Sequence, residues 1–260
     1  MRIHMKLMGT ISSILIIAAC TSVPPTINTV NVDPIATEIQ AHYNSLSAYE
    51  SSILSYDNGV MSLGLFGAVK PNRYKEVMQW ENNRPLPRIE VCNGNERKLF
   101  TPESLQILTD TYDCALKVND HFFVLDKVKR LSNYENTIRE IIISNDDYKD
   151  RIGFAGPGSS IDPPYRTLAS SDTGYWIYER NQEGETFPNG TGYPGVEVVF
   201  KDENNNDIRL VFSKDNYQLI KSEIIFENGG IKTSYYTDIR LNEVRMPTDM
   251  PSLEYLQNLY

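Results

Sequence analysis

The sequence predicts an α+β protein in which one curved antiparallel sheet carries helices on its concave side. Three observations predict this class. An amphipathic helix opens the globular part, a meander of alternating strands follows it, and the last third holds four strands separated by "DENNN", "KDNY" and "NGG". These separators are rich in Asn, Asp and Gly, which form tight hairpin turns. Strands linked by such turns pair antiparallel with their neighbours, so a continuous sheet is expected.

The opening helix is predicted over 34–47. Asp33 is a suitable N-cap, and Pro34 is accepted at the first helical position because its missing N–H would have no helical partner there. Ile35, Ile39 and Tyr43 then recur at the helical period, which gives the helix one apolar face.

The meander comes next. Alternating or glycine-interrupted apolar residues predict strands over 49–57, 59–69 and 71–81. A hairpin is predicted within 88–102, with its turn at Asn93–Gly94.

The middle of the chain changes period and predicts a helical insert over about 119–144, with a break allowed near Ser132. Its apolar positions fall on two helical stripes: Phe122, Leu125, Val128 and Leu131, then Tyr134, Ile138 and Ile141. The segment 145–168 is rich in Gly, Pro and Asp and is predicted to be a loop.

The last third predicts strands again. A short alternating segment surrounds Ile177, and four longer strands are expected over 195–201, 207–213, 218–226 and 231–240. An edge segment, with room for a short helix, closes the chain. The organisation is therefore residues 1–19 as a leader, 20–33 as a tether and 34–260 as one β-rich domain.

The leader decides the cellular context. Arg2, His4 and Lys6 precede an apolar run that is too short to span a bilayer, which needs about twenty residues. This order is typical of a secretory signal peptide. The "IAAC" that ends at Cys20 resembles the bacterial lipobox, which implies cleavage before Cys20 and acylation of its thiol, with palmitate-type chains. A plain signal peptide with a chance cysteine, or a short uncleaved anchor, are the alternatives.

The tether and the anchor imply a location. Residues 20–33 are polar, contain prolines and show no apolar period, which is typical of a linker. Acyl chains hold a protein on a membrane at about 0.8 kcal/mol per buried CH₂ group. Thr21 and Ser22 differ from the Asp that marks inner-membrane lipoproteins in many enteric bacteria. We therefore expect attachment to the outer membrane on its periplasmic face, with surface exposure as the alternative.

The charge excludes one class of partner. The whole chain has a formal charge of −9, and the loss of Arg2 and Lys6 with the leader brings it to −11. Such acidity argues against nucleic acid as a partner, because nucleic-acid binding depends on basic side chains. No pattern of catalytic or metal-ligating residues stands out, and no cofactor is predicted.

Two cysteines remain once Cys20 carries lipid. A pair of cysteines in an exported protein predicts a disulfide between Cys92 and Cys114. Two buried free thiols are the alternative.

Several segments together resemble the lipoprotein-localisation (LolA/LolB-like) fold. The stretches are "IQAHYNSLSAYESSI", "GLFGAVKPNRYKEV", "RIEVCNGNERKLFTP" and "IRLVFSKDNYQLIKSEIIFENGGIKTSYYTDIRLN", which cover about half of the chain in order. The resemblance implies an unclosed β-barrel with a helical lid over an apolar cavity. Cys92, Cys114 and the long loop after residue 144 depart from the pattern of the family.

Two apolar segments are candidates for contact with a hydrophobic ligand. The glycine-interrupted run at 60–69 is predicted as an inner strand, and it could also form a cavity wall or a protruding hairpin tip with Leu65 and Phe66 exposed. The insert could supply a lid face. The candidate residues are Leu63, Leu65, Phe66, Phe122, Leu125 and Val128.

The sequence therefore predicts a membrane-anchored, non-enzymatic envelope lipoprotein that binds an acyl chain, a lipid or another lipoprotein in a cavity of the curved sheet. The alternative is a structural or interaction lipoprotein of an envelope or polysaccharide-export assembly, whose sheet packs solidly. The interior of the sheet distinguishes the two, since a ligand binder keeps an apolar cavity of several hundred Å³.

Overall fold

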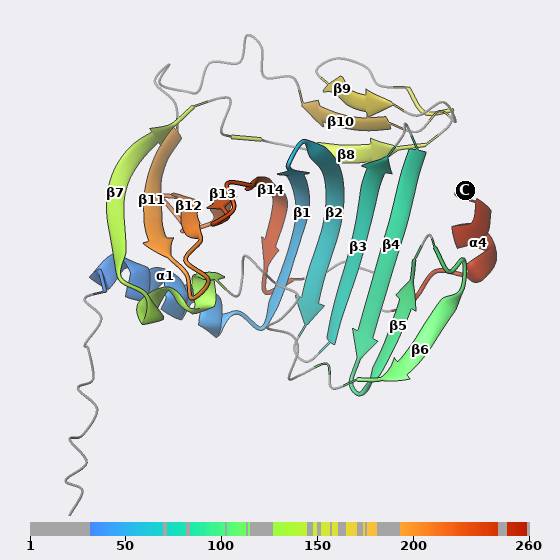
Figure 1. Cartoon of the computed structure of the whole chain (residues 1–260), viewed down its shortest axis with the longest axis horizontal. Helices are drawn as coiled ribbons and strands as arrows, with labels where there is room; N and C mark the ends of the chain where they lie inside the picture. Colours follow the sequence, from blue (N-terminus) through green and yellow to red (C-terminus); the bar gives the residue numbers. More distant parts are fainter. Residues whose placement is uncertain are drawn as a thin grey trace, which may run out of the picture.

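The computed structural model describes residues 32–69, 72–81, 84–101, 103–112, 114, 127–144, 148–149, 152–156, 158–160, 165–170, 174, 176–180, 193–243 and 249–258. Most of these residues belong to antiparallel strands that form two sheets (Figure 1). The fold is therefore dominated by sheet, with short helices at its margins.

The main sheet has eleven strands in the order β6-β5-β4-β3-β2-β1-β14-β13-β12-β11-β7. Its end strands β6 and β7 do not pair with each other, so the sheet is open. The bounds of its strands are β1 Ala48–Asp57, β2 Val60–Val69, β3 Asn72–Glu81, β4 Arg84–Asn93, β5 Glu96–Phe100, β6 Ile107–Thr111, β7 Asn136–Ile143, β11 Tyr193–Lys201, β12 Asp207–Ser213, β13 Leu219–Ile225 and β14 Ile231–Leu241.

One face of the main sheet packs against helix α1 (Pro34–Ser45). We call this side, which carries Tyr49 and Phe66, the α1 face. Asp33 caps the helix as predicted, because its Oδ1 accepts a hydrogen bond of 2.9 Å from the backbone N–H of Ile35. A short 3₁₀ helix, η1 (Leu131–Asn133), lies beside α1 and buries Leu131 in the same cluster.

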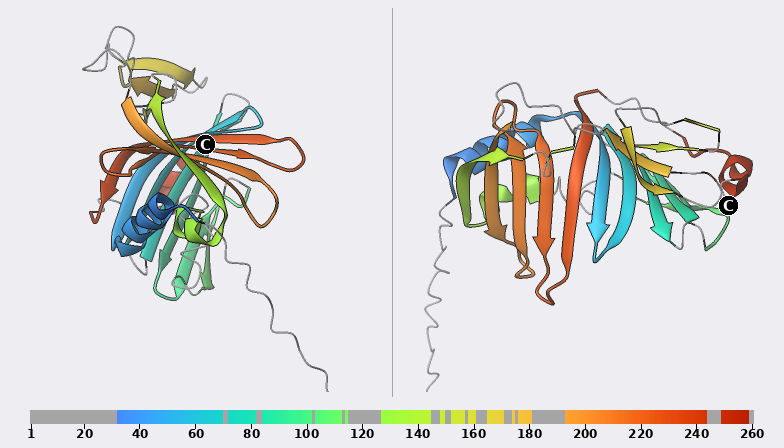
Figure 2. Two further views of the ribbon diagram at one scale, coloured as in Figure 1. Left: turned by 90° about the vertical axis from the view of Figure 1, so that its left-hand side faces the viewer. Right: turned by 90° about the horizontal axis from the view of Figure 1, so that it is seen from above.

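The opposite face carries Leu54 and Leu63, because side chains alternate along each strand. A small sheet in the order β8-β10-β9 covers part of this face through Ile152 and Ile177. Figure 2 shows α1 and the small sheet on different sides of the main sheet. The bounds are β8 Ile152–Ala155, β9 Tyr165–Ser170 and β10 Trp176–Arg180; the terminal helix α4 spans Leu253–Asn258.

The first three strands of the predicted meander and the last four strands are confirmed to within two residues at each end. The hairpin predicted within 88–102 is confirmed at its turn, but its first strand β4 begins four residues earlier than predicted, at Arg84. The β1–β2 turn illustrates why: Asn58 and Gly59 have φ of 48° and 87°, the left-handed values that a two-residue hairpin requires. The prediction that helices lie on the concave side is not settled by these elements and stays a prediction.

The helix predicted over 119–144 is wrong in its second half. Residues 136–143 form strand β7, which pairs antiparallel with β11 from Asn136↔Phe200 to Ile143↔Tyr193. The apolar positions are spaced by three or four, yet the segment is short and rich in isoleucine, and β-branched residues favour strands. Pairing with β11, which lies far along the chain, decided that this segment is a strand and not a helix. The first half of this helix, up to residue 126, lies outside the described residues.

The loop predicted over 145–168 is also wrong in part. It contains β8 and the start of β9, which with β10 build the small sheet. Ile152 and Phe154 on β8 pack with Leu54 and Leu63 of the main sheet. These strands are short, and they are stabilised by packing on the main sheet rather than by a pattern readable in their own sequence.

Candidate binding faces of the open sheet

The α1 face holds the largest apolar core among the described residues. Helix α1 contributes Ala36, Ile39 and Tyr43, each at most 1% exposed. The C-cap of α1, the sheet and the segment that precedes β7 contribute the rest of the buried cluster: Leu46, Tyr49, Phe66, Ala68, Val128, Leu131, Val196, Val198, Phe200, Ile208, Leu210, Phe212, Leu219, Ile224 and Tyr236.

Tyr43 fixes α1 to the hairpin between β12 and β13. Its hydroxyl donates to the carbonyl of Tyr217 at 3.0 Å and accepts from the backbone N–H of Leu219 at 2.8 Å. Burial raises the pKa of Tyr43 well above its ordinary value, raises that of Tyr49 to about 12, and raises that of Tyr236 further. These hydroxyls therefore stay protonated at neutral pH, and they serve packing and hydrogen bonding rather than proton transfer.

A second set of polar contacts joins the segment before η1 to α1 and to the β11–β12 turn. The Gln40 side chain donates to the carbonyl of Lys129 and accepts from the N–H of Ser132. The Lys127 ammonium donates to Asp202 Oδ2 at 2.6 Å, and the Asp202 carboxylate is fully buried. Burial alone would raise the pKa of Asp202, but hydrogen bonds from Lys127 and Asn206 more than offset this and lower it.

The structure separates the predicted ligand-contacting residues. Phe66 and Val128 meet in the α1 core, whereas Leu63 packs under the small sheet and Leu65 packs toward α4 on the opposite face. Phe122 and Leu125 lie outside the described residues. A protruding tip at Phe66 is excluded, because the β1–β2 turn lies at Asn58–Gly59 and Phe66 is only 5% exposed.

The α1 core is closely packed around Val128, Leu131 and Phe212. Side chains that line a cavity wide enough for an acyl chain keep some accessible surface, but Val128, Leu131 and Phe212 have none. Interdigitated side chains of this kind are typical of a packed protein interior. Around these three residues the α1 face therefore resembles a solid core rather than a ligand cavity.

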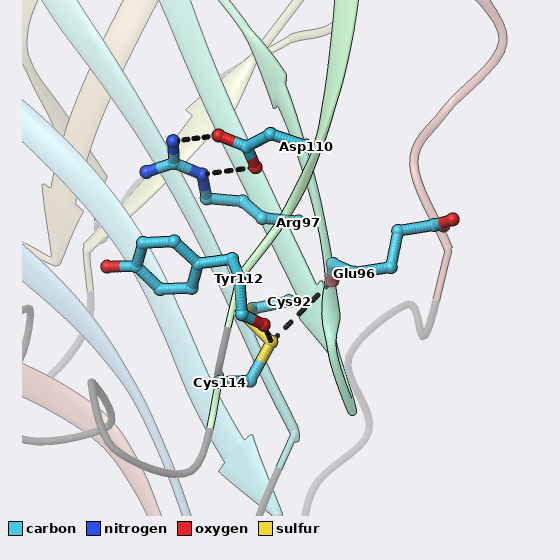
Figure 3. The surroundings of a disulfide bond; sticks show 6 residues. All are labelled: Cys92, Glu96, Arg97, Asp110, Tyr112 and Cys114. Atoms are coloured by element: carbon cyan, nitrogen blue, oxygen red, sulfur yellow. Dashed lines mark hydrogen bonds and ion pairs between the residues drawn. A yellow bond between two sulfur atoms is a disulfide. The ribbon is translucent and has the colours of Figure 1, made fainter.

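The other end of the same face carries the disulfide, which is confirmed. Cys92 on β4 and Cys114, just beyond the end of β6, are bonded with their Cα atoms 5.7 Å apart (Figure 3). Both are fully buried. The two cysteines are 22 residues apart in sequence, so the bond stabilises this end by about 3 kcal/mol in the chain-entropy model.

An ion pair beside the disulfide joins β5 to β6. The guanidinium of Arg97 donates through two nitrogens to the carboxylate of Asp110, and it lies 4.3 Å from the ring centroid of Tyr112 (Figure 3). The hydrogen bond from Arg97 lowers the pKa of Asp110. Covalent and ionic links thus hold the last strand of the sheet where little apolar surface is buried.

A buried carboxylate on the opposite face was missed by the sequence analysis. Glu197 on β11 has a fully buried side chain and accepts hydrogen bonds from Arg139 on β7 and Arg209 on β12. Burial would raise the pKa of Glu197, but the hydrogen bonds from both guanidinium groups lower it overall. If residues 136–143 had been read as a strand, the alternation of its side chains would have placed Arg139 beside Glu197 on one face of the sheet. The prediction of a helix there hid this neighbourhood.

A second set of charges lies under the small sheet. Lys149 pairs with Glu179 at 3.1 Å, and the ammonium groups of Lys149 and Lys221 lie 5.6 and 5.4 Å from the ring centroid of Tyr235.

Within the described ranges, no three acidic, histidine or cysteine side chains gather as a metal site would require. No described helix is both long enough and apolar enough to span a membrane. Cys20 lies outside the described residues, so its lipidation stays a prediction.

Comparison with known proteins gives distant likenesses of fold only. No family model and no curated protein matches the sequence. Among solved structures, an uncharacterized conserved protein from Thermus thermophilus has 10% identity and a TM-score of 0.42, with 83% of this chain and 96% of that one covered. The Pseudomonas aeruginosa MucA/MucB complex has 13% identity and a TM-score of 0.37, with 85% and 60% covered.

The neighbours also include a LolA superfamily protein from Nitrosomonas europaea, with 11% identity and a TM-score of 0.24, covering 80% of this chain and 94% of that one. At such low identity and TM-score, the function has to be argued from the geometry of this chain itself.

Proposed function

We propose that this chain is a non-enzymatic interaction protein of the bacterial envelope, held on the periplasmic face of the outer membrane by lipid on Cys20. The observation that carries the proposal is the close packing of the α1 core around Val128, Leu131 and Phe212, which have no accessible surface. A sheet whose described interior is packed leaves its outer surfaces and its edges for contact with other molecules.

The chemistry of the described polar clusters supports the non-enzymatic part. Glu197 and Asp202 are each held by hydrogen-bonded cations that lower their pKa, and the buried tyrosines have raised pKa values. A general acid or base functions best with a pKa near the working pH. These groups are shifted away from neutrality, so they stabilise the fold.

A second candidate function, binding of an acyl chain, a lipid or a lipoprotein, is favoured by one observation. Phe66 and Val128, from segments far apart in the sequence, meet on the α1 face as the sequence analysis proposed for ligand contact. In this hypothesis Phe122 and Leu125 complete the contact surface, and apolar contact supplies about 25 cal/mol per Å².

A titration with fluorescent palmitate separates the two functions. The test uses the mature chain with Cys20→Ser, and the interaction hypothesis predicts no saturable uptake of the probe. Saturable uptake that Val128→Asp abolishes, while Thr233→Asp on the opposite face does not, would replace our proposal by the second candidate. In parallel, the native lipidated chain should migrate in a blue-native gel as a complex with another envelope protein.

The anchor is tested independently of the ligand. Metabolic labelling with radioactive palmitate should mark the wild-type chain and leave Cys20→Ser unlabelled in the host bacterium. Membrane fractionation of the labelled chain then reports whether it resides in the outer membrane. Label that persists in Cys20→Ser would contradict the lipobox interpretation.

A further inference from the structure

The small sheet is inserted between two neighbouring strands of the main sheet. Strands β8, β9 and β10 lie between β7 and β11 in the sequence. These two flanking strands pair directly, with Ile143 at the end of β7 opposite Tyr193 at the start of β11. The chain therefore leaves the main sheet and returns to it at the same place. An insert whose two ends meet can move without breaking the ladder from which it starts.

The junction is held firmly on the side of the main sheet. The rings of Tyr148 and Tyr193 stack with their centroids 5.6 Å apart, and both pack against the buried side chain of Ile143 and its neighbours. A Cβ atom on Gly195 would come within 2.5 Å of Ile143, so β7 and β11 approach closely only because this residue has no side chain. Strand β8 begins soon afterwards, at Ile152.

The two sheets are separate hydrogen-bonded units. Among the described residues, the ladder of the small sheet runs β8-β10-β9, and the ladder of the main sheet includes none of these strands. The sheets are joined by side-chain packing, in which Ile152 and Ile177 meet Leu54 and Leu63 of β1 and β2. Three strands, β12, β13 and β14, separate this contact from β11 in the main sheet. The insert is therefore attached at the junction and docks at a remote point.

The docking surface is small and partly charged. Among the side chains that the structure describes, its buried cluster has four members, whereas the α1 core has eighteen. Buried charges lie beside it, since Glu179 of β10 is 3% exposed and Lys221 of β13 is 7% exposed. Lys149, which pairs with Glu179, lies over the ring of Tyr235. Buried ion pairs add little to docking, because lost hydration offsets their attraction. Small, polar interfaces within one chain permit relative motion.

Helix α1 covers the other face of the main sheet and is attached differently. Its buried residues Ala36, Ile39 and Tyr43 belong to the largest described core, and the hydroxyl of Tyr43 bonds to the β12–β13 hairpin. Loss of α1 would open that core, whereas loss of the small sheet would uncover only Leu54, Leu63 and their neighbours. The small sheet is therefore expected to separate at a lower free energy than α1.

We propose that β8, β9 and β10 form a hinged flap, which moves off the main sheet at the β7–β11 junction while the main sheet stays folded. The open form presents Leu54 and Leu63 on the main sheet, and Ile152 and Ile177 on the flap, as apolar surface. The chain thus has an apolar surface in only one of two conformations, so contacts through it depend on opening. This inference goes beyond the interaction function proposed above and does not depend on it.

Thiol labelling of two matched cysteine variants tests the flap. Both are made in the mature chain with Cys20→Ser, in which Cys92 and Cys114 remain bonded. Leu54→Cys places a thiol beneath the flap, and the control Leu210→Cys places one in the α1 core; the two leucines are 0% and 1% exposed. Without denaturant, we expect a water-soluble aromatic disulfide to label Leu54→Cys at least about a hundredfold faster than Leu210→Cys.

Two further measurements distinguish opening of the flap from unfolding of the sheet. In about 1 M urea, labelling of Leu54→Cys should change less than about threefold and that of Leu210→Cys should rise at least about tenfold, because sensitivity to urea scales with the surface exposed. Amide exchange at residues 52–55 should stay slower than labelling at residue 54, because the pairing of β1 with β2 and β14 survives when only the flap leaves.

Three outcomes would overturn the proposal: equal labelling of the two cysteines, the same urea dependence for both, or exchange of the β1 amides at the rate of labelling. Each would show that Leu54 is reached only when the main sheet unfolds. Circular dichroism checks that the variants are folded, and Leu63→Cys replaces Leu54→Cys if the latter is not. The interaction function is tested separately by the palmitate titration and the blue-native gel, so it would survive this failure.

Discussion

The two ends of the main sheet are stabilised in different ways. The β7 end packs on α1 through a cluster of eighteen buried residues, with Tyr43, Phe212 and Leu131 among them. At the β6 end, the buried cluster among the residues whose side chains the structure describes has four members, which are Ile89, Val91, Phe100 and Leu256. At this thinner end the Cys92–Cys114 bond and the Arg97–Asp110 pair join the last strands.

The difference shows how a sheet of eleven strands can extend beyond its main core. Apolar burial stabilises a strand in proportion to the area it covers, so a strand far from α1 gains little from it. A disulfide stabilises by restricting the unfolded chain and needs no large core. The thin end can therefore remain folded and still leave its outer edge open for contacts.

The largest effect should come from the core at the β7 end. Phe212→Ala removes a fully buried ring and leaves a cavity, so it should lower the free energy of unfolding by about 3–5 kcal/mol. Chemical denaturation followed by circular dichroism measures this. A cost below about 1 kcal/mol would mean that the core is loosely packed, and it would remove the main support for the interaction hypothesis.

The second-largest effect on the free energy of unfolding should come from the disulfide, and it should be concentrated at the β6 end. Replacing Cys92 and Cys114 together by alanine should lower the free energy of unfolding by about 3 kcal/mol. Hydrogen exchange should accelerate in β4, β5 and β6 more than in β11, β12 and β13. Uniform acceleration across the sheet would contradict the view that the two ends are stabilised separately.

A smaller effect should appear on acidification, at the β7 end. The pKa of Glu197 in the folded protein lies below its ordinary value of 4.5, so its contribution to stability is present above that value. The contribution is lost as the pH falls through the lower, folded pKa. In Glu197→Gln, the free energy of unfolding should fall less steeply as the pH drops below 4.5 than in the wild type, as measured by denaturation followed by tryptophan fluorescence.

The smallest effect on stability is expected at the free edge. Leu108 is 51% exposed, so Leu108→Thr should change the free energy of unfolding by no more than about 0.5 kcal/mol. The matched variant Ile142→Thr on β7 should behave likewise in the isolated protein. A large loss in Leu108→Thr, seen in thermal denaturation, would show that the leucine serves the fold rather than a contact.

The regions that the sequence predicted correctly depend on local chemistry. Hairpin turns such as Asn58–Gly59 and Asn93–Gly94 specify their own backbone conformation, and the N-cap at Asp33 specifies where α1 begins. The disulfide followed from the export context and the number of cysteines. Each of these features can be recognised within a few residues or from a count.

The failures depend on partners that lie far along the chain. Strand β7 carries apolar residues at a spacing that also fits a helix, and its pairing with β11, a strand distant in sequence, decided the matter. The small sheet exists because Ile152 and Ile177 pack on Leu54 and Leu63. The candidate ligand residues were taken as one set, but alternation along β2 places Leu65 and Phe66 on opposite faces of the sheet.

The sequence by itself determined one capped helix, the first strands of a meander, four terminal hairpin strands and the pairing of Cys92 with Cys114. Its lipobox-like leader stays a prediction. Only the tertiary structure decided that the sheet is open, that its α1 face packs closely around Val128, Leu131 and Phe212, and that α4 packs beside β6. The physical reason is that turns and caps act through neighbouring residues. The face on which a side chain lies, the packing of the core and the identity of the edge strands depend instead on which distant strands pair.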